Sequence, residues 1–216
     1  MEKITLYTNP NSRGRIIRWL LEECGADYEV VPVPYGENGT KSADYLAVNP
    51  MGKLPAVKYG DAVMTETAAL IIFLAELFPE KNLIPAAGTA ERGEFYRWLM
   101  FAMHAEYAFM DKWHGIPETP ERKRSIGYGS FDEVVATLTK FLHGKEYALG
   151  NRFTALEEFI SLFIVERKSL CIELYIMRLF DIFNSIFDKC EGTEPQEVHF
   201  QQPCALYYRV IELSHK

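Results

Sequence analysis

Three hydrogen-bond donors lie close together near the start of the chain, in the run Tyr7-Thr-Asn-Pro-Asn-Ser-Arg-Gly-Arg15. Tyr7 ends a short strand-like run, and Asn11 and Ser12 follow in a turn rich in Asn and Pro, before a helical pattern. A hydroxyl or carboxamide beside the free N–H groups of a helix N-terminus can donate to an anionic sulfur or oxygen. Each of the three can equally be an ordinary turn or core residue.

A second polar group, Thr65-Glu-Thr67, lies between a strand-like run and a segment with helical periodicity. Free N–H groups and the positive end of the helix dipole suit a carboxylate at such a position, and the Thr67 hydroxyl adds a donor. The alternative is that Thr65 or Thr67 simply caps the helix, as it would in a protein without a ligand.

Pro55 lies in the run Asn49-Pro-Met-Gly-Lys-Leu-Pro-Ala-Val57, just inside the start of a predicted strand. Proline cannot donate to a sheet ladder, so the strand is an edge strand or the Leu54–Pro55 peptide bond is unusual. A simple turn proline is the ordinary interpretation of an isolated Leu-Pro pair.

The elements that would position these groups follow from hydrophobic periodicity. Residues 1–80 predict the order β-α-β-α-β-β-α, a mixed sheet with helices packed on it. Gly25 suits a left-handed helix end, Gly60-Asp61 suits a hairpin, and Pro79 stops the last helix. The predicted strands cover 4–7, 28–33, 54–59 and 62–65, and the helices cover 16–24, 42–48 and 67–78.

Strand patterns disappear from Glu91 onward, and the second part of the chain is predicted to be helical. A long helix begins there, and Ser130-x-x-Glu133 is a capping box for another. The intervening segment 82–89 contains the Pro and Gly expected of a linker. We therefore predict two domains, at residues 1–82 and 88–216.

Composition excludes several function classes. The 216 residues carry a net charge of −7 without a basic half, so nucleic acid is not expected as a partner. The longest apolar run, Ala68 to Ala75, has eight residues, against the ~20 that cross a bilayer. The start of the chain lacks the apolar core of a secretory signal, and we expect a cytoplasmic protein. The cysteines show no metal-binding spacing, so we expect free thiols and no metal: Cys24, Cys171, Cys190 and Cys204.

Together, these runs resemble the cytosolic glutathione S-transferases of bacterial type. The resemblance rests on the runs at 7–15, 49–57 and 65–67, and on Leu149-Gly-Asn-Arg-Phe-Thr154 with Glu157, and it covers roughly residues 3–157. It implies an α+β thioredoxin-like domain followed by an all-α helical domain. It also implies that Thr154 and Glu157 cap a buried helix. Glu158 departs from the family pattern, in which an apolar residue follows the acidic one.

The resemblance further implies how glutathione would bind. The Leu54–Pro55 peptide would be cis, which leaves the Leu54 backbone unpaired at the sheet edge for the cysteinyl part of the tripeptide. Glu66 and Thr67 would hold the γ-glutamyl group, and Lys53 the glycyl carboxylate. Ser12 is the first candidate to stabilise the thiolate, with Asn11 and Tyr7 as alternatives.

The implied activity is conjugation of the glutathione thiolate to an apolar electrophile, in a homodimer. Tyr107, Met110 and Trp113 are candidates to line the electrophile pocket, although such a stripe is more often core. Two alternatives stay open: glutathione-dependent reduction of disulfides or peroxides, and a non-catalytic interaction module with the same fold.

Overall fold

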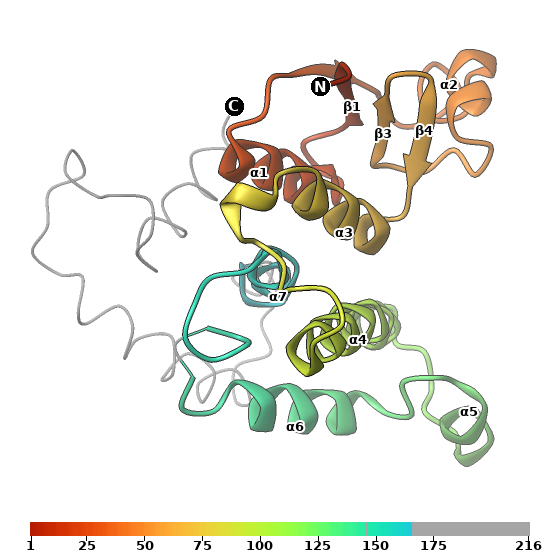
Figure 1. Cartoon of the computed structure of the whole chain (residues 1–216). Coiled ribbons are helices and arrows are strands. Elements are labelled where there is room, and N and C mark those ends of the chain that lie inside the picture. Colours follow the sequence, from red (N-terminus) through yellow and green to blue (C-terminus); the bar gives the residue numbers. More distant parts are fainter. Residues whose placement is uncertain (146, 166–216) are drawn as a thin grey trace, which may run out of the picture. The chain divides into compact units, whose positions relative to one another are not determined.

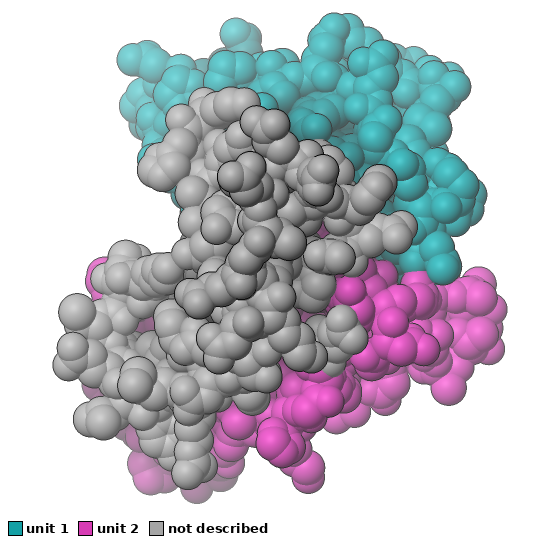
Figure 2. Space-filling view, turned by 90° about the vertical axis from the view of Figure 1, so that its left-hand side faces the viewer, with its two compact units in different colours: residues 1–84, 207–216 teal, residues 85–206 magenta. Residues whose placement is uncertain are grey.

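The computed structural model of the chain describes residues 1–145 and 147–165 (Figure 1). They form two compact units that meet in sequence between Ile84 and Pro85 (Figure 2). The predicted domain limits, 1–82 and 88–216, extend past the described residues and stay a prediction. Within the described ranges, no helix has both the length and the hydropathy of a membrane span.

The first unit has the predicted order of elements around a four-stranded sheet. The sheet order is β2-β1-β3-β4, with β1 parallel to β2 and the other pairs antiparallel. The strands are β1 (Ile4–Thr8), β2 (Tyr28–Pro32), β3 (Ala56–Tyr59) and β4 (Ala62–Thr65), and the helices are α1 (Gly14–Cys24), α2 (Ala43–Val48), α3 (Thr67–Leu77) and a 3-10 turn η1 (Pro79–Lys81). This is the thioredoxin-like arrangement that the sequence predicted.

Strand β1 buries alternate residues because successive side chains point to opposite faces of a sheet. Ile4 and Leu6 are at most 1% exposed, and helices α1 and α3 pack side by side next to them (Figure 1). Tyr7 points to the other face, where it packs on the buried cluster of Val33, Tyr45 and Leu54. The apolar residues of α1 and α3 supply most of the core of this unit, at positions 16, 17, 20, 21, 70, 71 and 74.

Helix α1 begins at a close contact with β1. A Cβ atom on Gly14 would lie 1.9 Å from Thr8 Oγ1, so only glycine lets the first turn approach the strand this closely. The helix ends at Gly25 in the left-handed conformation, with φ 63°, as its sequence position predicted. These two glycines fix where the turn containing Ser12 meets the sheet.

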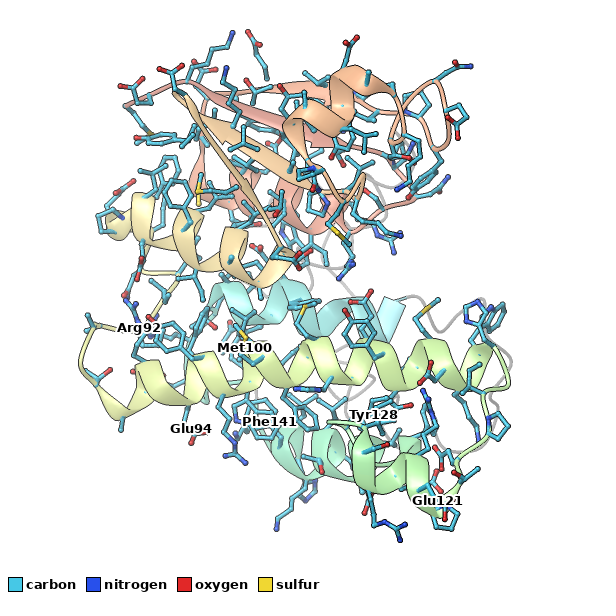
Figure 3. All side chains as sticks on the ribbon, turned by 90° about the vertical axis from the view of Figure 1, so that its right-hand side faces the viewer. Arg92, Glu94, Met100, Glu121, Tyr128 and Phe141 are labelled. Carbon is cyan, nitrogen blue, oxygen red and sulfur yellow. The ribbon has the colours of Figure 1, made fainter. Side chains whose placement is uncertain are left out.

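The second unit is helical over its described residues. It contains α4 (Ala90–Trp113), α5 (Pro120–Ser125), α6 (Phe131–Leu142) and α7 (Ala155–Val165). Phe141 lies between α4 and α6 and stacks on Trp98 at 3.5 Å between ring centroids (Figure 3). Ser130 caps α6 as predicted, because its hydroxyl accepts from the Glu133 N–H at 3.3 Å and donates to that side chain at 2.7 Å.

A polar cluster joins the end of α4 to α5 and the loop after it. Asp111 accepts from Tyr128 at 2.6 Å and pairs with Arg122. These hydrogen bonds, with that of Tyr128 first, lower the pKa of the Asp111 carboxyl. The segment between α4 and α6 is thus held by charge-assisted contacts and not by a large apolar core.

Candidate functional site

Strand pairing brings the three polar segments of the first unit to one end of the sheet. Tyr7, at the end of β1, pairs with Ala56 at the start of β3, and Ala56 pairs with Thr65 at the end of β4. The turn after β1, the segment before β3 and the start of α3 therefore leave the sheet at the same end. Residues separated by more than fifty positions in sequence can serve one ligand there.

Ser12 lies in the turn between β1 and α1, and its hydroxyl is fully used within that turn. It donates to the Asn9 carbonyl at 2.8 Å and accepts from the N–H groups of Asn9 at 3.3 Å and Gly14 at 3.0 Å. A serine hydroxyl offers one donor and two acceptor positions, so this geometry is saturated. To donate to a ligand, the hydroxyl must turn away from the Asn9 carbonyl, which still accepts from the Ser12 N–H at 2.9 Å.

The other two candidates for the thiolate differ in their surroundings. The Asn11 side chain is exposed, and its carboxamide has no hydrogen-bond partner within the described part of the chain, although its backbone is bound by Asn9 and Tyr35. Tyr7 lies on the α2 face of the sheet, with its ring centroid 6.0 Å from that of Tyr45. Unlike the Ser12 hydroxyl, the Asn11 carboxamide and the Tyr7 hydroxyl take part in no hydrogen bond among the described residues.

The Leu54–Pro55 peptide bond is cis, as predicted. The alternative of an edge strand is wrong, because β3 is an internal strand, and Leu54 lies two residues before that strand begins. No hydrogen bond to the Leu54 backbone occurs among the described residues. Its N–H and C=O are consequently available to a ligand with an extended backbone. Lys53, just before it, is exposed.

Two residues that the sequence did not single out hold this segment in place. The Tyr45 hydroxyl donates to the Lys53 carbonyl at 2.7 Å, and the Asn49 side chain donates to the same oxygen at 2.8 Å. Burial raises the pKa of Tyr45 to about 12, so its hydroxyl stays a donor through the neutral range. In the sequence, Asn49 was visible only as the first residue of the run 49–57, and Tyr45 only as a residue inside a predicted helix.

Glu66 and Thr67 lie at the start of α3. Glu66 has φ 70°, one of two non-glycine residues with positive φ among those described, and its side chain is exposed. No side chain caps the helix, so the N–H groups of its first turn are left for another acceptor. Thr67, the first residue of the helix, is buried, with 2% of its surface exposed.

The three residues predicted to line an electrophile pocket lie on α4 in the second unit. Tyr107, Met110 and Trp113 are 57%, 45% and 59% exposed, so they are not part of the core of this unit. Their position relative to Ser12 stays a prediction. No group of three or more His, Cys, Asp or Glu side chains with metal-binding geometry occurs within residues 1–145 and 147–165.

Thr154 and Glu157 form the predicted cap at the start of α7. The Glu157 carboxylate accepts from the Thr154 N–H at 3.0 Å, from its hydroxyl at 2.7 Å and from the Ala148 N–H at 2.8 Å. Burial raises the pKa of Glu157 despite these donors. Glu158 has no exposed surface, so the departure from the family pattern lies inside the unit. The role of Thr154 and Glu157 is structural, since their hydrogen bonds close the start of α7.

Comparison with known proteins finds relatives in both sequence and fold. Residues 2–76 match the family described as glutathione S-transferase, N-terminal domain. Glutathione S-transferase GstA of Escherichia coli O157:H7 is 25% identical over 195 residues, which cover 89% of this chain and 95% of that protein. Among solved structures, a glutathione transferase from Methylococcus capsulatus strain Bath has a TM-score of 0.71 at 25% identity, over 99% of this chain and 100% of the other.

A sphingomonad glutathione S-transferase, solved in complex with glutathione, has a TM-score of 0.70 at 23% identity, with 98% of each chain covered. The match in sequence is concentrated on the unit that contains the three site segments, and the match in fold extends over nearly the whole chain. The first unit thus matches the N-terminal domain of glutathione S-transferases in sequence, and the chain has the fold of these proteins, with a thioredoxin-like first domain and a helical second domain.

Proposed function

We propose that the chain binds reduced glutathione at the shared end of the sheet and conjugates its thiolate to an apolar electrophile. The observation that supports this most directly is the register Tyr7 to Ala56 to Thr65, which gathers the site segments at one sheet end. A tripeptide needs backbone partners and an anion position at opposite ends of such a site, and the unpaired Leu54 backbone and the uncapped α3 start provide them.

The backbone at Glu66 supports the same assignment. Holding a non-glycine residue at φ 70° costs of the order of 1–3 kcal/mol of conformational energy. Strained backbone of this kind persists only where the surrounding structure enforces it, and it is concentrated at ligand-binding sites. Here the unusual turn presents the exposed carboxylate beside the first N–H groups of α3. In the proposed complex, Glu66 pairs with the γ-glutamyl ammonium, and Thr67 with the helix N–H groups binds its carboxylate. Lys53 meets the glycyl carboxylate.

The chemistry requires a thiolate. Its sulfur electron pair forms the new carbon–sulfur bond, the electrophile releases its leaving group with the bonding pair, and the thiol proton goes to solvent. Ser12 remains the first candidate to donate to the sulfur, and turning its hydroxyl costs about one hydrogen bond, roughly 0.5–1.5 kcal/mol. Asn11 and Tyr7 are the alternatives, and Asn11 needs no such rearrangement. Tyr107, Met110 and Trp113 would contact the electrophile.

Calorimetry with reduced glutathione tests the binding site. Combining Glu66→Ala with Thr67→Ala removes a charge pair and a donor, each worth about 1.5–3 kcal/mol, so affinity falls on the order of a hundredfold or more. The matched control is Glu37→Ala, an exposed carboxylate in a loop of the same unit. Unchanged affinity in the double variant would place the ligand elsewhere.

The reaction is tested with a chloronitrobenzene and with a glutathione mixed disulfide, which separates transfer from reduction. Loss of the donor to the thiolate should lower the rate by about 10²–10³. Comparing the rates of Ser12→Ala, Asn11→Ala and Tyr7→Phe identifies which residue donates to the thiolate. Homodimeric assembly belongs to the same proposal, and a mass near that of one chain by light scattering would contradict it.

A further inference from the structure

Asn9 lies between β1 and the Ser12 turn and uses both ends of its side chain. Its Nδ2 donates to the Val33 carbonyl at 3.1 Å, just after the end of β2, and its Oδ1 accepts from the Asn11 N–H at 3.0 Å. The Val33 N–H in turn donates to the Thr8 carbonyl at 2.8 Å. One side chain thus ties the turn to the parallel strand pair.

The backbone of Asn9 makes the remaining contacts of the turn. Its carbonyl accepts from both the N–H and the hydroxyl of Ser12, at 2.9 and 2.8 Å, and its own N–H donates to that hydroxyl at 3.3 Å. The carbonyl of Asn11 is held separately by the Tyr35 hydroxyl at 3.1 Å. Apart from the Tyr35 contact, the hydrogen bonds that hold Asn11 and Ser12 to the end of β1 among the described residues are therefore all made by Asn9.

We infer that Asn9 is a positioning residue, whose carboxamide holds Asn11 and Ser12 where one of them donates to the sulfur of glutathione. This rests on the proposed function. The position needs a donor toward Val33 and an acceptor toward Asn11 at once, and a carboxamide supplies both. A serine hydroxyl at this position can accept from the Asn11 N–H, but it is one short group and does not reach the Val33 carbonyl at the same time, and alanine offers neither contact.

The experiment compares Asn9→Ala and Asn9→Ser with Asn38→Ala, a control in an exposed loop of the same unit. Three quantities are measured: the affinity for reduced glutathione, the pH at which the bound thiol ionises, followed by its ultraviolet absorbance, and kcat and KM with a chloronitrobenzene. Amide exchange of residues 9–12 is measured in the free protein.

In Asn9→Ala, the bound thiol should ionise at higher pH and kcat should fall on the order of ten- to a hundredfold, because small misplacements of a catalytic group have effects of this size. Glutathione affinity should change by less than about threefold, since it depends on Leu54, Glu66 and Thr67. Asn9→Ser should recover part of kcat and of the protection of Asn11, and Asn38→Ala should match the wild type.

The inference is overturned if Asn9→Ala leaves the thiol ionisation or the exchange of Asn11 and Ser12 as in the wild type. It is also overturned if glutathione affinity falls as far as kcat, because Asn9 would then support the whole site without a specific role. Absence of glutathione binding by the wild-type chain would refute the proposed function instead. Exchange in the free protein would then still decide whether Asn9 holds the turn.

Discussion

Replacing Gly14 by alanine tests the contact that brings α1 against β1. The new Cβ would lie 1.9 Å from Thr8 Oγ1, about 1.5 Å short of ordinary van der Waals contact. Rotating the Thr8 hydroxyl gives no relief, because Thr8 Cβ would lie at 2.8 Å and Ser12 Oγ at 2.9 Å. The helix start must therefore move away from the strand.

The balance of two effects gives the size of the change. Alanine gains up to about 1 kcal/mol over glycine in a helix, whereas overpacking costs roughly 1–3 kcal/mol. Thr8 is 7% exposed and is paired within the sheet, so it can move little to make room for the new methyl group. The overpacking cost therefore lies at the top of this range. We expect the free energy of unfolding to fall by about 2 kcal/mol.

Urea denaturation followed by circular dichroism measures this change, and Gly93 provides the matched control. It lies inside α4, where an added Cβ atom would meet no neighbouring atom within 4 Å, so Gly93→Ala should raise stability by about 0.5–1 kcal/mol. Adding Thr8→Ala to Gly14→Ala should recover part of the loss. If Gly14→Ala is as stable as the wild type, the reasoning from the close contact is refuted.

Two further predictions concern the buried hydrogen bonds. Glu157→Gln turns a donor toward the N–H of Ala148 or Thr154 and should cost about 1–3 kcal/mol of unfolding free energy by urea titration. Burial raises the pKa of Glu157, so the folded state holds this proton more tightly than the unfolded state does. The contribution of Glu157 to stability is therefore largest in acid and is lost as pH rises through the raised pKa. The slope of unfolding free energy against pH should accordingly change in Glu157→Gln, and a slope equal to that of the wild type would contradict this. Tyr45→Phe keeps the ring but loses the hydroxyl that donates to the Lys53 carbonyl. This change should lower the free energy of unfolding by about 0.5–1.5 kcal/mol and raise the KM for glutathione a few-fold. Unchanged values would show that Asn49 alone holds that carbonyl.

The sequence predicted the elements of the first unit because their signals are local. Alternation along β1, the left-handed glycine after α1 and the hairpin at Gly60-Asp61 each act over a few residues. Helix α5 has only six residues, which are too few to carry a hydrophobic periodicity. Residues beyond 165, which include Cys171, Cys190 and Cys204, lie outside the described residues.

The site could be predicted by segment but not by hydrogen bond. Motif spacing identified the turn, the Leu54–Pro55 segment and the α3 start, because each has a distinctive residue order. The Ser12 hydroxyl has all its hydrogen bonds filled only because of its rotamer and the backbone conformation at Asn9. Neither of these can be predicted from the residue order. The contact of Tyr45 with the Lys53 carbonyl likewise depends on how α2 packs on the sheet.

The three tryptophans of the chain differ sharply in exposure, which makes them separable spectroscopic probes. Trp19 and Trp98 are 3% and 6% exposed, and Trp98 is stacked on Phe141, whereas Trp113 is 59% exposed on α4. A polar quencher such as iodide therefore reaches chiefly Trp113 in the folded chain. The emission that iodide removes reports on the end of α4, and the emission that it leaves reports on the two cores.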